Sequence, residues 1–394
     1  MSGVNFTITI TENVQQVLGK VDAAIKEVGV NVKNATQSLG KSINAQAISN
    51  GLSELRSGFK ELTSPMLSYN SSLTELSAIT GLSGKALKEN GDNARKLAVL
   101  YGTDASVGVE SFKVFLSKLS PELSKSSEAM KLMGNNAFVL SKSMGDDTAG
   151  AASLLSTAMN QFAVDTSDPI KAASTMTSMM NVMAASAKAG SAELPQIGQA
   201  LEQVGGIAKT VGVSFEETNA AIQVLDKAGK TGAEGGVALR NVLMTLGRGE
   251  FLPKASLEGL KAAGVDVNAL GDKSKSLKER LELLKPVMND TAFMSQLFGA
   301  ENLLAGQALM ENTQLLGEYT NAVKGTNAAQ EYADTVMGSL TEKMKRQAAW
   351  VTDLKIGFSE AIAPMIPFLD GSLSVVDSMG KFALSITSIS EVVK

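Results

Sequence analysis

Residues 51–80 read GLSELRSGFKELTSPMLSYNSSLTELSAIT, and this stretch sets the fold class. Its apolar side chains recur every three or four residues over about four heptads, the pattern of a long amphipathic helix. This apolar line, called the seam below, is formed by Leu52, Leu55, Phe59, Leu62, Met66, Tyr69, Leu73 and Leu76. Pro65 interrupts the run, and proline lacks an amide donor, so we expect two helices kinked at this point that share one stripe.

Two interpretations of the seam remain open. It could close a helical hairpin packed on the body of the protein, or it could join copies of the chain. Few complementary charges flank the stripe, which favours the hairpin. A seam that spans ~40 Å along a helix is nevertheless long enough for self-association, which is the site hypothesis adopted for these residues.

The rest of the chain is predicted to be helical apart from its start. Residues 4–10 alternate apolar and polar, which predicts one short strand. Residues 14–39 follow a helical period, and from residue 81 onward many short amphipathic segments are cut by glycine. We therefore predict an all-α, multi-helical bundle of short amphipathic helices, with long flanking helices and one short N-terminal strand. Its predicted parts are residues 1–80, 81–330 and 331–394.

Local signals place several helix ends. Asp168-Pro169 predicts a helix that continues through Ala189, because aspartate caps a helix and proline suits its first position. Ser214 followed by Glu217 forms a capping box ahead of an apolar run. Further helices are predicted at 238–246, 276–284, 291–316 and 330–362. Asp146-Asp147 is interpreted as a pair of acids at a helix start, where the positive end of the helix dipole favours them.

Composition excludes much chemistry. The 394 residues contain no His and no Cys, which removes imidazole bases, thiolate nucleophiles and the usual zinc ligands. Lys and Arg number 36 against 40 Asp and Glu, so nothing favours nucleic-acid binding. The densest basic stretches are interpreted as solvated helix faces; they comprise Lys273, Lys275, Lys278 and Arg280, and Lys343, Lys345 and Arg346. No cofactor, metal or catalytic residue is predicted.

Two motifs that suggest chemistry fail on spacing. Residues 229–232, GKTG, lack the earlier glycine of a phosphate-binding loop and follow a helix rather than a strand. The SGFK at 57–60, SYN at 68–70 and KTG at 230–232 imitate a serine acyltransferase, but the first two lie too close together. No run of ~18 apolar residues predicts a membrane span, since charges interrupt residues 356–393.

Six blocks in the same order resemble the core region of phage tail tape measure proteins. They are LSAITGLSG at 76–84, VGGIAKTVGVSFEETNAAIQVLDKA at 204–228, GAEGGVALR at 232–240, GVDV at 264–267, LFG at 297–299 and the segment 337–360. The resemblance covers about residues 70–362. Val237 and Lys230 depart from the family's usual residues, and the segment 112–135 fits less well.

The resemblance implies a structural role rather than an enzyme. Tape measure proteins are made in the host cytoplasm, lie inside the tail tube of the virion, set the tube's length and leave ahead of the DNA. The implied partners are other copies of the chain, the tail tube protein, tail assembly chaperones, baseplate or tail-tip proteins and, after ejection, the host membrane. Alternatives are the tape measure of a tailocin or contractile injection particle, and a membrane-active helical protein. Since many family members are far longer, we expect this chain to be truncated.

Overall fold

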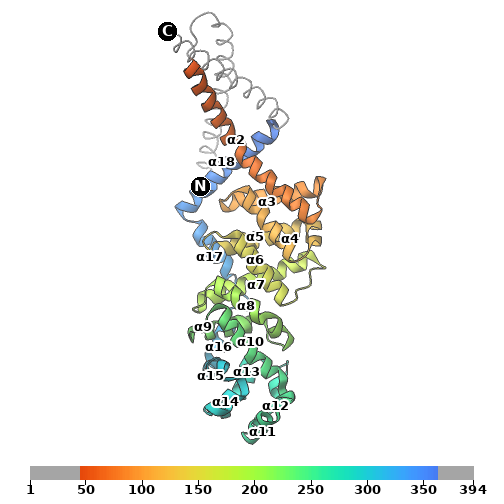
Figure 1. The fold of residues 1–394 in the computed structure, drawn as a ribbon, viewed down its shortest axis with the longest axis vertical. Helices are drawn as coiled ribbons and strands as arrows, with labels where there is room; N and C mark the ends of the chain where they lie inside the picture. The colour runs from red at the N-terminus through yellow and green to blue at the C-terminus, as the bar shows by residue number, and fades with distance from the viewer. Residues whose placement is uncertain (1–44, 363–394) are drawn as a thin grey trace, which may run out of the picture. The chain divides into compact units, whose positions relative to one another are not determined.

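The computed structural model describes residues 45–362, and within them every regular element is a helix (Figure 1). The α-helices of the first half are α2 Ala45–Thr80, α3 Gly84–Tyr101, α4 Ala105–Lys118, α5 Ser127–Ser141, α6 Thr148–Gln161, α7 Pro169–Ala189, α8 Leu194–Thr210 and α9 Phe215–Lys227. Those of the second half are α10 Gly232–Arg248, α11 Lys254–Ala262, α12 Val267–Gly271, α13 Leu277–Glu282, α14 Thr291–Phe298, α15 Leu303–Glu311, α16 Thr313–Ala322, α17 Ala328–Met337 and α18 Leu340–Ile362. The predicted all-α class is confirmed, whereas the strand at 4–10 and the helix at 14–39 lie outside the described residues.

The chain divides into two compact units. One consists of residues 1–66 together with 355–394, and the other is Leu67–Leu354. The second unit is therefore inserted, in sequence, between the two parts of the first. The predicted boundaries at residues 80 and 330 remain predictions.

Helix α2 does not break at Pro65. It runs without interruption over 36 residues with the proline inside it, so the expectation of two helices was wrong. Proline removes the bond to the carbonyl of Glu61, one turn earlier. Ser359 donates its hydroxyl to the neighbouring carbonyl of Leu62 at 3.0 Å, so a contact far away in sequence supplies a donor close to the proline.

Helices α3 to α10 form a stack of four helical pairs within Leu67–Leu354. The pairs begin at residues 84, 127, 169 and 215, and each helix packs on the helix two places further along the chain. One row holds α3, α5, α7 and α9, and the other holds α4, α6, α8 and α10 (Figure 1). A repeat of roughly 43 residues whose members contact their neighbours is the arrangement of an α-solenoid.

Side-chain amides make polar contacts at several levels of the stack. Asn90 donates to the carbonyl of Ser124 at 3.2 Å, and Asn136 donates to the hydroxyl of Thr177 at 2.9 Å. Gln223, in the last pair, donates to the carbonyl of Ala192 at 3.0 Å. Each of these bonds joins one pair of helices to the next and satisfies a polar group that the packing would otherwise bury.

The chain then turns and comes back along the stack. Helices α15 and α16 pack on α9, α17 packs on α7 and α5, and the first residues of α18 reach α3 and the end of α5. These returning helices form a third layer against the row of α3, α5, α7 and α9 (Figure 1). The second unit therefore begins and ends beside α3.

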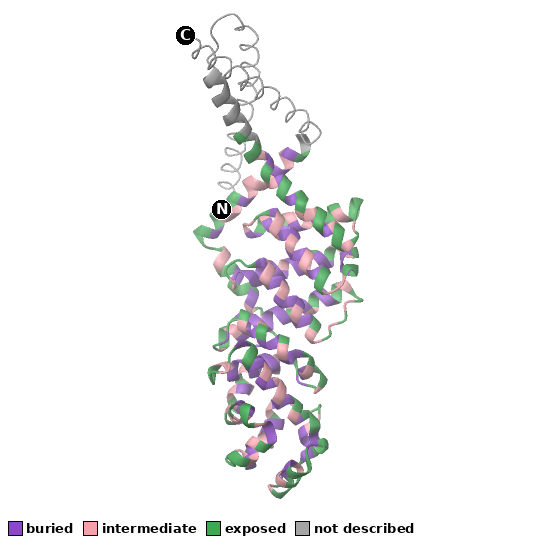
Figure 2. Cartoon of the chain, viewed as in Figure 1, coloured by how far each residue is buried: buried purple, intermediate pink, exposed green. Residues whose placement is uncertain are grey.

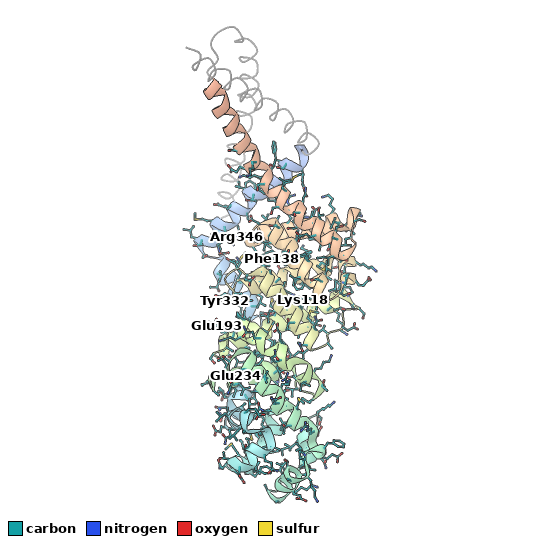
Figure 3. The ribbon with its side chains drawn as sticks, viewed as in Figure 1. Lys118, Phe138, Glu193, Glu234, Tyr332 and Arg346 are labelled. Carbon is teal, nitrogen blue, oxygen red and sulfur yellow. The ribbon has the colours of Figure 1, made fainter. Side chains whose placement is uncertain are left out.

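The core consists of aliphatic, methionine and phenylalanine side chains. Figure 2 shows buried residues in purple along the whole stack. Phe112 and Phe115 of α4 are fully buried, as is Met133 of α5. The rings of Tyr101 and Phe138 stack with centroids 5.2 Å apart and planes within 2°. Phe138 is labelled in Figure 3. Burial of such side chains from several pairs makes one continuous core along the stack.

Two glycines allow the helices to approach backbone to backbone. A Cβ on Gly108 would lie 2.3 Å from the carbonyl oxygen of Ala94, and one on Gly236 would lie 2.4 Å from that of Ala200. The second contact explains why α10 starts at Gly232, earlier than the predicted residue 238. The glycines of its first turns weaken the helix intrinsically but permit close packing on α8.

Most capping predictions were confirmed. Helix α7 starts at Pro169 with Asp168 accepting from the amide of Lys171, and Ser214 and Glu217 form the capping box of α9. The helix predicted over 291–316 is divided by Gly299, which has φ 84°, and the one predicted over 330–362 is divided at residues 338–339. Gly299 ends α14 in a conformation with positive φ that glycine adopts readily, whereas Gly338 keeps a helical conformation and the further division at Asn312 involves no glycine.

Candidate functional site

The seam residues all lie on α2 but differ in what surrounds them. Leu52, Leu55 and Phe59 belong to the part of α2 for which only the backbone is described. Met66, Tyr69 and Leu76 are buried, while Leu62 and Leu73 are half-buried.

The end of the seam packs on α3 of the same chain. The guanidinium carbon of Arg95 lies 6.0 Å from the ring centroid of Tyr69, within the range of a cation–π contact. A Cβ at Gly91 would meet the side chains of Leu73 and Tyr69 at 2.7 Å. Hydrophobic contact within one chain therefore accounts for this part of the stripe. Self-association through the earlier seam residues remains a prediction.

A cluster of four charged side chains joins the returning helix to the stack, and it is called the ion-pair cluster below. Lys142 bonds to Glu342 at 2.6 Å and to Asp146 at 2.7 Å. Lys345 bonds to the same two carboxylates, at 2.7 and 2.5 Å. The side chains of Lys142 and Glu342 are only 3% and 4% exposed, so their pairing takes place away from water.

The geometry of the ion-pair cluster depends on the backbone at its centre. Lys142 also donates to the carbonyl of Tyr101 at 3.1 Å, which fixes its ammonium between α3 and α18. Asp146 has φ 68°, a left-handed conformation that costs a non-glycine residue energy. Asp147 caps α6 by accepting from the amide of Gly150 at 2.8 Å, and Asp146 directly precedes it, so both acids lie at a helix start as interpreted.

The ion-pair cluster shifts the pKa of both its carboxyls downward. Burial alone would raise the pKa of Glu342 and that of Asp146, but hydrogen bonds from Lys142 and Lys345 outweigh it. The same bonds raise the pKa of Lys345. The folded chain therefore holds the charged forms of these groups more firmly than the unfolded chain does.

Acid is expected to weaken the fold through this cluster. A carboxyl with a lowered folded pKa stabilises the fold above its unfolded pKa, and this contribution disappears as pH falls through the folded value. The loss should lie below the ordinary values of 4.5 for glutamate and 3.8 for aspartate. Urea unfolding of the chain and of Glu342→Gln, compared at neutral and acidic pH, checks this. Equal acid sensitivity of the two proteins would contradict it.

Two further contacts hold the two ends of the fold. Within Leu67–Leu354, Arg95 pairs with the carboxylate of Asp353 and donates to its carbonyl oxygen at 2.8 Å. Within the other unit, Lys355 pairs with Glu61 at 2.8 Å, beside the bond from Ser359 to Leu62. Sequence reasoning missed all of these pairs because their members lie 200 or more residues apart.

One of the basic residues interpreted as solvated, Arg280, is not, whereas Lys345 keeps 41% of its side chain exposed. Arg280 is fully buried and donates to the carbonyls of Leu270 at 2.6 Å and Val211 at 2.9 Å. Burial lowers its pKa. Lys345 takes part in the ion-pair cluster, as described above. The local sequence pattern does not show whether a basic side chain on a helix will reach the carbonyl groups of another helix or loop.

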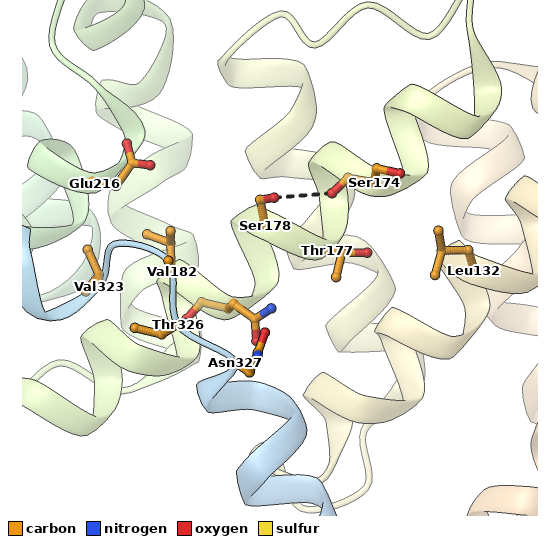
Figure 4. A pocket seen from close by; sticks show the side chains of 11 residues that line it. Leu132, Ser174, Thr177, Ser178, Val182, Glu216, Val323, Thr326 and Asn327 are labelled. Carbon is orange, nitrogen blue, oxygen red and sulfur yellow. Dashed lines mark hydrogen bonds between the residues drawn. The ribbon is translucent and has the colours of Figure 1, made fainter.

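Two hollows of the second unit are lined mainly by polar groups, and the smaller, of about 400 Å³, includes Ser214, Glu217 and Lys273. The larger, of about 630 Å³, lies between α7 and the loop before α17 and is lined mostly by hydroxyl and amide groups, with Glu216 as its one charged residue (Figure 4). Among the described residues no three or more His, Cys, Asp or Glu side chains gather as metal ligands. Lys230 of the GKTG motif pairs with Glu234. Over residues 45–362 there is also no helix long and apolar enough to span a membrane.

Comparisons with known proteins point to phage tails. Residues 124–299 match the model of a family described as phage-related minor tail protein. The chain is also 24% identical over 243 residues to a tape measure protein of Pneumococcus phage Dp-1. That match covers 59% of this chain and 20% of the relative, so the chain spans about a fifth of that protein's length. No solved structure matches the chain.

Proposed function

We propose, from the premise that this chain is a phage tail structural protein of the tape measure family, that it sets tail length during assembly and is released ahead of the DNA. The likeness to phage tail proteins supports a place in the virion and contact with other tail components, and it suggests a structural rather than an enzymatic role. We propose the lumen of the tail tube as its place there. The observation that carries the proposal is its likeness to the tape measure protein of phage Dp-1.

A ruler needs elements whose length is fixed by residue number. Helix α2 has 36 residues, which at ~1.5 Å each gives ~54 Å of rigid length. We propose that such helices, continued by chain on either side, carry the measurement. The partners proposed for them are other copies of the chain, the tube protein, assembly chaperones and the tail-tip proteins.

Tail length should follow the length of the flanking helix. An insert of about 18 helix-forming residues between Asn50 and Gly51 adds five turns and keeps the faces of α2 in register, so the tail should lengthen by ~27 Å. Electron microscopy of tails from phage that carry the insert measures this. Point substitutions at exposed Ser57 serve as the control and should leave the length unchanged. An unchanged length with the insert would contradict the ruler.

Self-association through the seam is part of the same proposal. Replacing Leu55 and Leu62 with aspartate puts charge on an apolar stripe, and we expect it to lower the oligomer mass in light scattering. Ser57→Asp with Ser64→Asp adds the same charge at exposed positions of α2 and should leave the mass as it is. Equal masses for the seam variant and the unaltered chain would refute association through these residues.

A further inference from the structure

Residues far apart in sequence meet where the inserted unit begins and ends. The hydroxyl of Ser359 lies 3.0 Å from the carbonyl oxygen of Leu62, although 297 residues separate the two positions. The neighbouring pair, Lys355 and Glu61, is joined at 2.8 Å. The chain therefore leaves the first unit near residue 66 and comes back to it at residue 355, at the side of the helix that it left.

Two contacts within Leu67–Leu354 close the same loop. Arg95 holds Asp353 across 258 residues, and Lys142 holds Glu342 across 200 residues. Both join the first helices of the stack to α18, which is the last layer of the return. The helices run along the stack in two rows and return in a third. The start and the end of this unit therefore lie at the same end of the stack, and the net displacement along it is small.

We propose that the folded segment between Leu62 and Ser359 adds no length to the ruler. This segment forms a closed loop, because its first and last residues are in contact. Only the residues before Leu62 and after Ser359 contribute to the length that the protein measures. A single helix of the same number of residues would extend ~445 Å, whereas its two ends are here within hydrogen-bonding distance. This inference rests on the proposed ruler function. It assigns the setting of tail length to the residues outside the folded segment and none of it to the segment itself.

Full extension of the residues between Leu62 and Ser359 would require the fold to be undone. Release of α18 would break the bonds of Glu342 to Lys142 and of Asp353 to Arg95, and further extension would separate the helices that share the core of the stack. Folded domains lie some 5–15 kcal/mol below their unfolded chains. Assembly of the tail would need to supply this free energy in order to extend the folded segment between Leu62 and Ser359.

A cross-link tests the closure directly. The chain contains no cysteine, so Glu61→Cys with Lys355→Cys gives one defined pair for a short bismaleimide. We expect most of the purified chain to be joined within one molecule, and each single-cysteine variant to show no such product. Tails assembled by the double variant should give the same intramolecular product. Its absence from tails, with its presence in the purified chain, would overturn the inference.

An insertion in the body separates this inference from the ruler itself. Lys324 and Gly325 lie in an exposed turn of the return path, and a Cβ on Gly325 would meet no atom within 4 Å. A flexible insert of about 18 residues there should be tolerated and should leave tail length unchanged, whereas the insert of equal size before Gly51 lengthens the tail. If the body insert also lengthens the tail, the loop opens in the particle and the inference fails while the ruler stands. If neither insert has an effect, the ruler proposal fails.

Discussion

Replacing Gly236 with alanine is expected to lower the free energy of unfolding by about 3 kcal/mol, although alanine is the better helix former. The added Cβ would lie 2.4 Å from the carbonyl oxygen of Ala200 and 2.7 Å from its Cα. Both are backbone atoms of α8, so no side chain can rotate away to make room. The two helices must separate, which opens the core between the last two pairs. Urea unfolding followed by far-ultraviolet circular dichroism measures the loss.

Gly206 provides the matched control on α8 itself. A Cβ there meets nothing closer than 3.4 Å, so Gly206→Ala should keep the packing and raise the free energy of unfolding by up to about 1 kcal/mol. The two substitutions have the same chemistry and differ only in what the methyl group meets. Equal effects of Gly206→Ala and Gly236→Ala would show that α8 and α10 do not approach as closely as described.

Removal of the Glu342 carboxylate should have the second large effect. Glu342→Ala leaves Lys142 buried among α3, α5 and α18 without its main counter-ion, and loss of one partner of a buried pair costs about 3–5 kcal/mol. We expect α18 to detach before the stack unfolds. Limited proteolysis, with cleavage appearing first between α17 and α18, and urea unfolding together measure this.

Two variants test the cause. Glu89 pairs with Lys85 on the exposed side of α3, so Glu89→Ala removes a glutamate from a helix at a cost of less than about 0.5 kcal/mol. The double variant Lys142→Met with Glu342→Leu removes both buried charges and should recover most of the stability. A double variant as unstable as Glu342→Ala would show that the packing of the site, rather than its charge, holds α18.

Sequence reasoning succeeded where the cause is local. Asp168 and Ser214 each contact the first turn of the helix that follows, so their signal lies within four residues. The break expected at Pro65 was wrong because local chemistry was the only guide, while Ser359 lies 297 residues from Leu62. Helical periodicity predicted the all-α class for the same reason, because the spacing of apolar residues in each stripe depends only on the sequence of that one helix.

The arrangement of the helices could not be predicted in this way. Neighbouring pairs of the stack are joined by contacts such as Asn90 to Ser124 and Asn136 to Thr177, and no common motif marks these positions as repeats. The ion-pair cluster was equally hidden, since Lys345 and Asp146 each have an ordinary local explanation. Only the fold shows that α18 comes back to α3 and α5, and that this return brings Lys345 to Asp146 across 199 residues.

The closed loop also decides how the chain responds to force. Tension on the two ends of the chain would act first on the contacts between Leu62 and Ser359, then on Arg95 with Asp353, and only then on the ion-pair cluster. These contacts lie one after another along the path of the force, so each bears the tension only when the previous one has parted. A stack whose pairs hold only their neighbours can then come apart pair by pair. A chain pulled through a narrow tube would thus yield in small steps rather than in one large rupture.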